Sequence, residues 1–176
     1  MKTNMIKTIT LALTLFFVGN IGYSQTNMQE PLAGVKNSMQ YKTVDLIYMD
    51  KDLSTFANLL MLSGLDASLS MTDKSHTLFI PTNEAFREMS IEDFAELTNP
   101  TNRAKLVDFV NRHFKGSKIM SNQLTESKVL DAENGDAIEI TNYAGQVAVG
   151  GARVIAADIE TANGIVHVVN DIIKYN

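Results

Sequence analysis

Hydrophobic residues occupy both odd and even positions of the segment 164–173, near the end of the chain. Successive side chains of a β-strand point to opposite faces, so neither face of an extended segment with this pattern suits water. Asn163 and Gly164 stand at its start, and both residue types tolerate the positive φ of a turn. The pattern therefore predicts a strand that is buried on both faces and lies in the middle of a sheet.

Helical spacing dominates the first half of the chain. Val44, Ile47 and Tyr48 recur at i, i+3 and i+4, which predicts a short helix with one buried face. A second helix is predicted from Asp52, a capping residue, to Gly64, because glycine suits the left-handed position that follows a helix. The apolar stripe of this second helix consists of Leu53, Phe56, Leu59, Leu60 and Ser63.

Two more helices are predicted in the middle of the chain. Ser90 and Asp93 have the spacing of a capping box and precede an apolar run. The following helix is expected to begin at Asn102 and to end at Gly116. Its core-facing stripe consists of Leu106, Val107, Val110 and Phe114.

The hydrophobic period changes to two beyond Lys118. Three short strands are predicted there, joined by turns that contain Asn and Gly: 137–141, 146–149 and 152–155. Their order predicts a β-meander that leads into the final strand. The second half of the domain is therefore expected to be a sheet.

One short strand is also predicted earlier, at 77–80, and Pro81 should end it because proline has no N–H to give a ladder. Thr82 or Asn83 would then accept hydrogen bonds from the free amides of a helical turn. Helices in the first half and strands in the second predict an α+β domain.

The N-terminus has the pattern of a secretory signal. Lys2 and Lys7 precede an apolar run, 9–18, and small residues follow up to Ser24. We expect residues 1–24 to be removed as a signal peptide, and a retained N-terminal anchor is the alternative.

Residues 25–40 are polar and aperiodic, which predicts a flexible linker ahead of a single domain at 41–176. The chain contains no cysteine, so it can form neither a disulfide nor a lipid anchor on cysteine. We therefore expect the domain to be stabilised by its core alone, with no stable membrane anchor after cleavage.

The formal net charge is −5 and becomes more negative when the two lysines of the signal segment are removed. Nucleic-acid binding needs a cluster of lysine and arginine, and none occurs along this chain. We expect no nucleic-acid partner.

The sequence also lacks the motifs of common catalytic sites. There is no cysteine, no Gly-x-Ser-x-Gly elbow and no Gly-rich phosphate loop. The three histidines, His76, His113 and His167, show no metal-ligand spacing. We therefore expect a protein that is not an enzyme, with no catalytic residue, cofactor or metal.

The acidic segment 131–136 admits two interpretations. It concentrates carboxylates beside a glycine, as a calcium loop does, but the glycine is misplaced for an EF-hand and no acidic residue follows at the twelfth position. A solvated turn before a strand is the interpretation that we favour.

Two segments resemble the conserved boxes of the fasciclin domain family. Residues 77–86, Thr-Leu-Phe-Ile-Pro-Thr-Asn-Glu-Ala-Phe, are similar to the first box, and residues 163–169, Asn-Gly-Ile-Val-His-Val-Val, to the second. The resemblance covers about residues 43–175 and implies a fasciclin-like β-wedge or sandwich of short strands, with several helices of the N-terminal half packed against it. The residues that carry this structural motif are Thr82, Asn83, Gly164 and His167.

The resemblance further implies adhesion or matrix-type interaction. In animal matrix members, an Asp-Ile pair just upstream of the second box and a Tyr-His pair are associated with integrin binding. The matching candidate binding residues here are Asp158 with Ile159, and Arg112 with His113, where arginine stands in the tyrosine position. Asp158 and Ile159 also have a structural interpretation, in which Asp158 satisfies backbone amides at a turn and Ile159 fills the core.

Two histidines have structural interpretations as well. His167 shares a strand face with Ile165 and Val169, which favours a buried neutral imidazole over a metal ligand. His113 is expected to join the last helix to the sheet through a hydrogen bond, with direct binding as the alternative.

Two classes of function remain. The first is an exported, non-enzymatic module for cell-surface or extracellular-matrix adhesion, whose partner is a cell-envelope or extracellular protein or polysaccharide. The second is a periplasmic binder of a small or lipidic ligand, which would need an apolar cavity of several hundred Å³, on the order of other ligand pockets. Periplasmic and extracellular locations both stay open, as does the oligomeric state.

Overall fold

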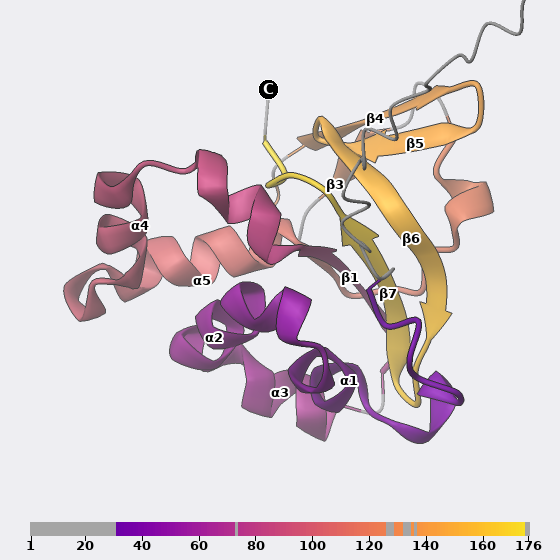
Figure 1. The fold of residues 1–176 in the computed structure, drawn as a ribbon, viewed down its shortest axis with the longest axis horizontal. Helices are drawn as coiled ribbons and strands as arrows, with labels where there is room; N and C mark the ends of the chain where they lie inside the picture. Colours follow the sequence, from indigo (N-terminus) through magenta and orange to yellow (C-terminus); the bar gives the residue numbers. More distant parts are fainter. Residues whose placement is uncertain (1–30, 73, 126–128, 132–134, 136, 175–176) are drawn as a thin grey trace, which may run out of the picture.

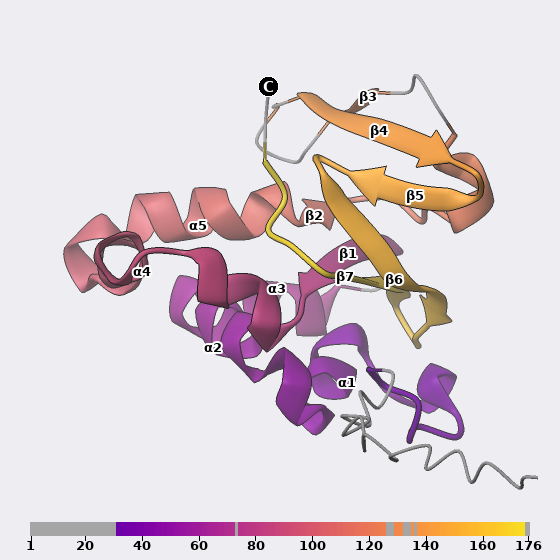
Figure 2. The ribbon, with the colours of Figure 1, turned by 45° about the horizontal axis from the view of Figure 1, so that its top comes forward.

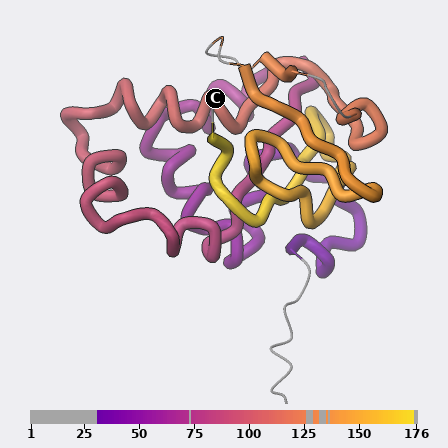
Figure 3. Tube along the Cα trace, turned by 90° about the horizontal axis from the view of Figure 1, so that it is seen from above, coloured from indigo at the N-terminus to yellow at the C-terminus, as the bar shows by residue number. Residues whose placement is uncertain are grey.

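The computed structural model describes residues 31–72, 74–125, 129–131, 135 and 137–174. The expected signal segment and the first part of the expected linker lie outside these residues. Helices form one half of the molecule and strands the other, as the views in Figures 1 and 3 show. The domain is α+β, as the sequence predicts.

Seven strands form one mixed sheet in the order β2-β1-β7-β6-β5-β4-β3. β1 and β7 are parallel, and every other neighbouring pair is antiparallel. The strands are β1 (His76–Pro81), β2 (Phe114–Lys115), β3 (Val129–Asp131), β4 (Ala137–Tyr143), β5 (Gln146–Val149), β6 (Ala152–Glu160) and β7 (Gly164–Val169).

The last strand, β7, lies in the middle of the sheet between β1 and β6. All six of its residues are buried, so the prediction of a strand covered on both faces is confirmed. The strand is shorter than predicted, because the chain bends after Val169 and the side chain of Asn170 accepts a hydrogen bond from the N–H of Arg153, at 2.8 Å. Ile173 then returns to the core beside the meander.

The helices pack on one face of the central strands (Figures 1 and 2). They are α1 (Thr43–Met49), α2 (Ser54–Ser63), α3 (Leu65–Met71), α4 (Ile91–Thr98) and α5 (Arg103–Arg112). The 3₁₀ turns along the chain are η1 (Ser38–Gln40), η2 (Lys51–Leu53), η3 (Asn83–Glu88), η4 (Pro100–Asn102) and η5 (Ser121–Gln123), of which η5 lies beside β6. Val166 and Val168 of β7 face the helical layer and join the helix-side core with Leu46, Leu60 and Val110.

The other face of the central strands closes against the meander. Lys115 of β2 donates from Nζ to the carbonyl oxygen of Asp131 in β3, at 2.6 Å, which brings the two edges of the sheet together. The sheet therefore curls into a barrel-like wedge. Its interior holds a second core cluster formed by Phe79, Leu124, Ile138, Ile140, Val149, Ala152, Val169 and Ile173.

Two predicted helix signals are confirmed. The hydroxyl oxygen of Ser90 accepts a hydrogen bond from the N–H of Asp93 at 3.0 Å and caps α4. Gly64 follows α2 with a φ of 77°, in the left-handed region that glycine favours.

Three helix details differ from the prediction. Tyr48 is 46 % exposed, because α1 is only two turns long and turns this side chain outward. Asp52 does not cap α2; the side chain of Asp50 accepts from the N–H of Asp52 and begins the preceding turn η2. α5 ends at Arg112 rather than at Gly116, because Phe114 enters β2 and pairs with β1.

Residues 31–40, within the segment expected to be a linker, contact the domain. Leu32 is buried in the helix-side core, and its N–H donates to Oδ2 of Asp50 at 2.7 Å. The segment then forms η1 and leads directly into α1. Leu32 and Val35 are the residues of this stretch that pack on the helix-side core, and two apolar residues three positions apart are too few to show a periodicity.

None of the helices within the described ranges is long and apolar enough to span a membrane.

Candidate functional site

The backbone of β6 is irregular where it passes the second conserved box. Its pairing with β7 shifts between Val154 and Ala156 and again between Ala156 and Ile159. Asp158 lies in the second shift with a φ of 58°, a left-handed conformation that Asp and Asn adopt more readily than most residues. A bulge of this kind re-aims the side chain that it carries.

The carboxylate of Asp158 is directed at η5. Its Oδ1 accepts from the N–H of Ser121 at 2.7 Å, and its Oδ2 accepts from the hydroxyl of Ser121 at 2.5 Å. These bonds fasten the segment before β3 to the middle of the sheet. Asp158 therefore satisfies a backbone amide, but at η5 rather than at the Asn163-Gly164 turn.

His167 holds the same segment from β7. Its Nε2–H donates to the carbonyl oxygen of Ile119 at 2.9 Å, and its Nδ1 accepts from the N–H of Asp158 at 3.2 Å. The ring stacks on Phe79 with 5.2 Å between ring centroids. Burial lowers the pKa of His167, against smaller opposing contributions from the Ile119 hydrogen bond and the charge of Asp158. The neutral ring is a structural link between η5, β6 and β7.

The other candidate binding residues are engaged within the fold. Ile159 is half-buried and packs against the helix-side core. Arg112, also half-buried, pairs with the carboxylate of Asp108 one helical turn earlier. Arg112 precedes β2 and Asp158 lies in β6, so β1 and β7 separate these two places in the sheet.

His113 is fully buried at the end of α5. Its Nδ1–H donates to the carbonyl oxygen of Phe109 at 2.8 Å, and its Nε2 accepts from the N–H of Ile173 at 3.3 Å. The ring packs against Phe56 and Phe109, with centroid separations of 5.4 and 4.8 Å. His113 thus joins the helix to the segment after β7.

Burial lowers the pKa of His113 from 6.5 to about 4, with the Phe109 hydrogen bond raising it and the Arg112 charge lowering it further. The unfolded chain takes up a proton first on acidification, so His113 favours folding above about pH 6.5 and this contribution is lost as the pH falls towards 4. Because of His113 alone, we expect the unfolding free energy to fall by about 1.5 kcal/mol when the pH is lowered from about 6.5 to about 5. Burial also lowers the pKa of His76 and of His167, so these two residues likewise reduce the unfolding free energy as the pH falls.

Urea unfolding at stepped pH checks this expectation, with NMR titration of the imidazole rings to assign the groups. The pH interval from about 6.5 to about 5 lies above the pH range in which ordinary carboxylates titrate. A stability that stays constant across it, or a His113 ring that titrates near 6.5, would contradict the buried neutral assignment.

Residues of the second conserved box join helices to the sheet and allow two strands to approach closely. Asn163 accepts from the N–H of Thr43 at 2.9 Å and donates to the carbonyl oxygen of Leu69 at 2.9 Å. A Cβ on Gly164 would lie 2.7 Å from the carbonyl oxygen of His76, so glycine permits the close approach of β1 and β7.

The first box differs in detail from the prediction. Asn83 does not cap its own turn; it accepts from the N–H of Thr55 at 2.8 Å and donates to the carbonyl oxygen of Lys51 at 2.8 Å. It therefore satisfies groups at the start of α2. The side chain of Thr82 makes no capping bond, while its N–H donates to the carbonyl oxygen of Val169 at 3.1 Å.

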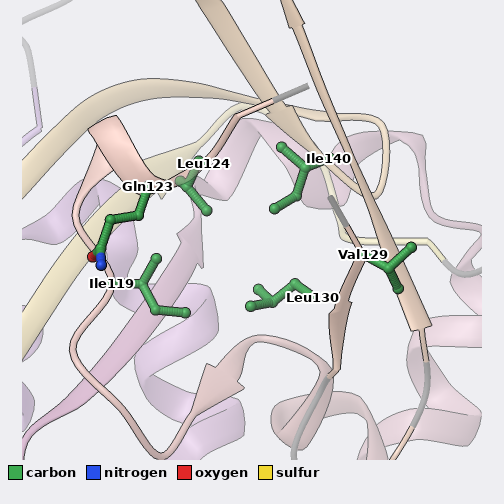
Figure 4. A pocket seen from close by; sticks show the side chains of 6 residues that line it. All are labelled: Ile119, Gln123, Leu124, Val129, Leu130 and Ile140. Carbon is green, nitrogen blue, oxygen red and sulfur yellow. The ribbon is translucent and has the colours of Figure 1, made fainter. Parts of the chain in front are cut away.

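Two small hollows adjoin η5. The apolar one measures about 200 Å³, and Ile119, Leu124, Leu130 and Ile140 surround it (Figure 4). The second measures about 250 Å³ and lies on the other side of the segment, towards β6. Pockets for drug-sized ligands measure roughly 300–1,000 Å³, so both are below that range.

Within the described residues, no three His, Cys, Asp or Glu side chains lie close enough together to hold a metal ion. Most of the acidic segment 131–136, which admits a calcium loop or a solvated turn from its sequence, lies outside those residues.

The sequence model of the Fasciclin domain matches residues 51–175. The chain belongs to the fasciclin domain family. Fasciclin domains are typically extracellular or secreted, and they are generally adhesion domains without enzymatic activity.

Three proteins of other organisms align with most of the chain. The Synechocystis protein sll1483 is 28 % identical over 98 % of this chain and 98 % of its own length. The transforming growth factor-beta-induced protein ig-h3 of Sus scrofa is 26 % identical over 74 % of this chain, which spans 19 % of that protein. A Plasmodium falciparum protein named heme ligase is 31 % identical over 72 % of this chain and 73 % of its own length.

The fold is also that of a solved fasciclin structure. A FAS1 domain pair from the insect cell adhesion molecule fasciclin I superposes with a TM-score of 0.57 and 19 % identity, over 76 % of this chain and 50 % of that one.

Removing the Asp158 carboxylate is expected to destabilise this fasciclin domain. In Asp158→Ala the Ser121 N–H loses its acceptor and alanine must adopt a φ of 58°, so we expect a loss of about 2–3 kcal/mol. Asp158→Asn keeps an acceptor oxygen and a side chain that tolerates this conformation, and should cost less than about 1 kcal/mol. Urea unfolding measures both, and equal losses would refute the assignment.

Proposed function

We propose that this fasciclin domain is exported and acts without enzymatic chemistry, in adhesion or protein interaction at a cell surface or in the extracellular matrix. The observation that carries the proposal is the family match, which extends over residues 51–175. The geometry of two of the three histidines supports it, because both ring nitrogens of His113 and of His167 are committed to hydrogen bonds inside the fold, while Nε2 of His76 is buried without a hydrogen-bond partner among the described residues. A general base needs a ring nitrogen within reach of a substrate.

Export to the periplasm or the extracellular space is part of the proposal. Its support is the signal pattern of residues 1–24 together with the usual location of fasciclin domains. The mature chain would begin near Gln25 and carry no lipid, because it has no cysteine. Its partner would be a cell-envelope or extracellular protein or polysaccharide.

A periplasmic binder of a small or lipidic ligand is the second candidate. The apolar hollow of Figure 4 favours it, and one relative bears the name heme ligase. The volume of this hollow, about 200 Å³, holds no more than a short hydrocarbon segment. Adhesion therefore remains the better supported function.

N-terminal sequencing of protein recovered outside the cytoplasm tests export, and a start near Gln25 is expected. An intact Met1 on a product confined to the cytoplasm would contradict it. Binding of the exported protein to intact cells and to isolated envelope polysaccharide then tests interaction. Asp158→Asn is included because it removes a charge with little cost to folding; unchanged capture would exclude an ionic contact at Asp158.

A further inference from the structure

The second hollow differs from the first in chemistry. It is open to solvent, measures about 250 Å³ and has no ionisable residue in its lining. Val147 and Val154 form an apolar wall that continues from the interior of the wedge. Asn122 of η5 and Asn142 of β4 line the same space. We call this space, defined by these four residues with Ala157, the amide hollow.

The two amides of the hollow are available for binding. Among the residues that the structure describes, neither the Asn122 nor the Asn142 side chain has a hydrogen-bond partner. Asn142 is half-buried on the inner face of the β4–β5 hairpin, opposite Val147. Each amide offers two N–H donors and one carbonyl acceptor. Together they present donors and acceptors to a neutral molecule.

The walls of the amide hollow are held in place by the contacts already described. Ser121, which precedes Asn122, is fastened to β6 by the Asp158 carboxylate. Asn142 and Val147 are paired across the β4–β5 ladder, and Val154 pairs with Val169 of the central strand. A ligand would meet a largely preformed site, which lowers the ordering cost of binding.

We propose that the amide hollow binds one uncharged sugar ring of a glycan. Sugar hydroxyls both donate and accept hydrogen bonds, as the two amides do, and the C–H face of a pyranose matches the valine wall. An anionic sugar would find no cation among the lining residues, and leaving its charge uncompensated is unfavourable. The volume admits a single ring rather than a longer segment.

This inference rests on the proposed adhesion role for the source of the ligand, which would be a polysaccharide or glycoprotein outside the cell. It also gives Asp158 a different role from that of a candidate binding residue. The carboxylate is a positioning residue for Asn122 through Ser121, not a contact of the partner.

Binding is tested by NMR titration of the purified protein with methyl glycosides of glucose, galactose and mannose, and with glucuronate as the anionic comparison. We expect saturable shifts of the Asn122 and Asn142 side-chain amides with at least one neutral glycoside. Asn142→Ala should weaken that binding roughly fivefold to tenfold, as the loss of one neutral hydrogen bond predicts. Asn122→Ala, at an exposed position, provides the same test if Asn142→Ala does not fold.

Asn58→Ala is the matched control, because Asn58 is exposed on α2 and does not line the hollow. It should bind as the unchanged protein does. The proposal is overturned if no neutral glycoside gives saturable shifts, if both hollow variants bind unchanged, or if glucuronate binds as tightly. If no sugar binds while the protein still attaches to cells, only this inference is contradicted. If the protein does not attach to cells at all, the adhesion role itself is contradicted.

Discussion

Replacing Val168 by aspartate is expected to leave the chain unable to fold. Val168 is fully buried in β7, where it pairs with Ile80 on one side and Ala156 on the other and packs under the helices. An unpaired carboxylate or carboxylic acid at that position costs on the order of several kcal/mol, beyond the lost apolar contacts. Domains of ordinary size are stable by only about 5–15 kcal/mol.

Circular dichroism and size-exclusion chromatography measure the outcome. Tyr143→Asp is the control, since Tyr143 is 84 % exposed at the β4–β5 turn and should accept the same charge with little loss. A soluble Val168→Asp protein with an unchanged melting temperature would show that β7 is not the centre of the core.

Asn163→Ala is expected to have the second largest effect, a loss of about 2–5 kcal/mol. Its buried side chain accepts from the N–H of Thr43 at 2.9 Å and from the Thr43 hydroxyl at 3.1 Å, and it donates to the carbonyl oxygen of Leu69 at 2.9 Å. Truncation leaves a donor and an acceptor unpaired inside the domain, at about 1–3 kcal/mol each. The contacts of α1 and α3 with the sheet would loosen together.

Chemical unfolding compares this variant with Asn58→Ala, which removes an exposed amide from α2 and should change stability by less than about 0.5 kcal/mol. Similar small losses of stability for both variants would mean that the hydrogen bonds of Asn163 contribute no more to stability than hydrogen bonds to water would. Asn163 would then be a turn residue only, as its sequence context suggests.

Local patterns made much of the fold predictable. The apolar run of β7, the capping residues Ser90 and Gly64, and the alternation of the meander each follow from interactions within a few residues. Together with the two boxes, they led to the α+β class and to the family, which the fold and the family match confirm.

Elements with weak local patterns were missed. α3 has a single buried apolar residue, Leu69, and β2 is two residues long. The parallel pairing of β1 with β7 joins segments that lie far apart in the sequence. Hydrophobic spacing identifies strands but does not say which strands become neighbours.

The candidate site was the least predictable part. Asp158 and Ser121 are 37 positions apart, and Thr43 and Asn163 are 120 apart. No spacing rule links such pairs, and Ser121 and Ile119 lie in a segment with no periodicity of its own. The N–H and the hydroxyl of Thr43 are both bonded to Asn163, and no local pattern around Thr43 predicts this pairing.

Attachment of the purified protein to intact cells is the most direct test of a role outside the cytoplasm that depends on binding. Fluorescently labelled protein is titrated onto producing cells whose own copy has been deleted, with the unfolded Val168→Asp variant as the negative control. We expect saturable attachment that unlabelled protein displaces and that the variant lacks. Attachment that never saturates, or that the unfolded variant reproduces, would contradict adhesion as the function of this fasciclin domain.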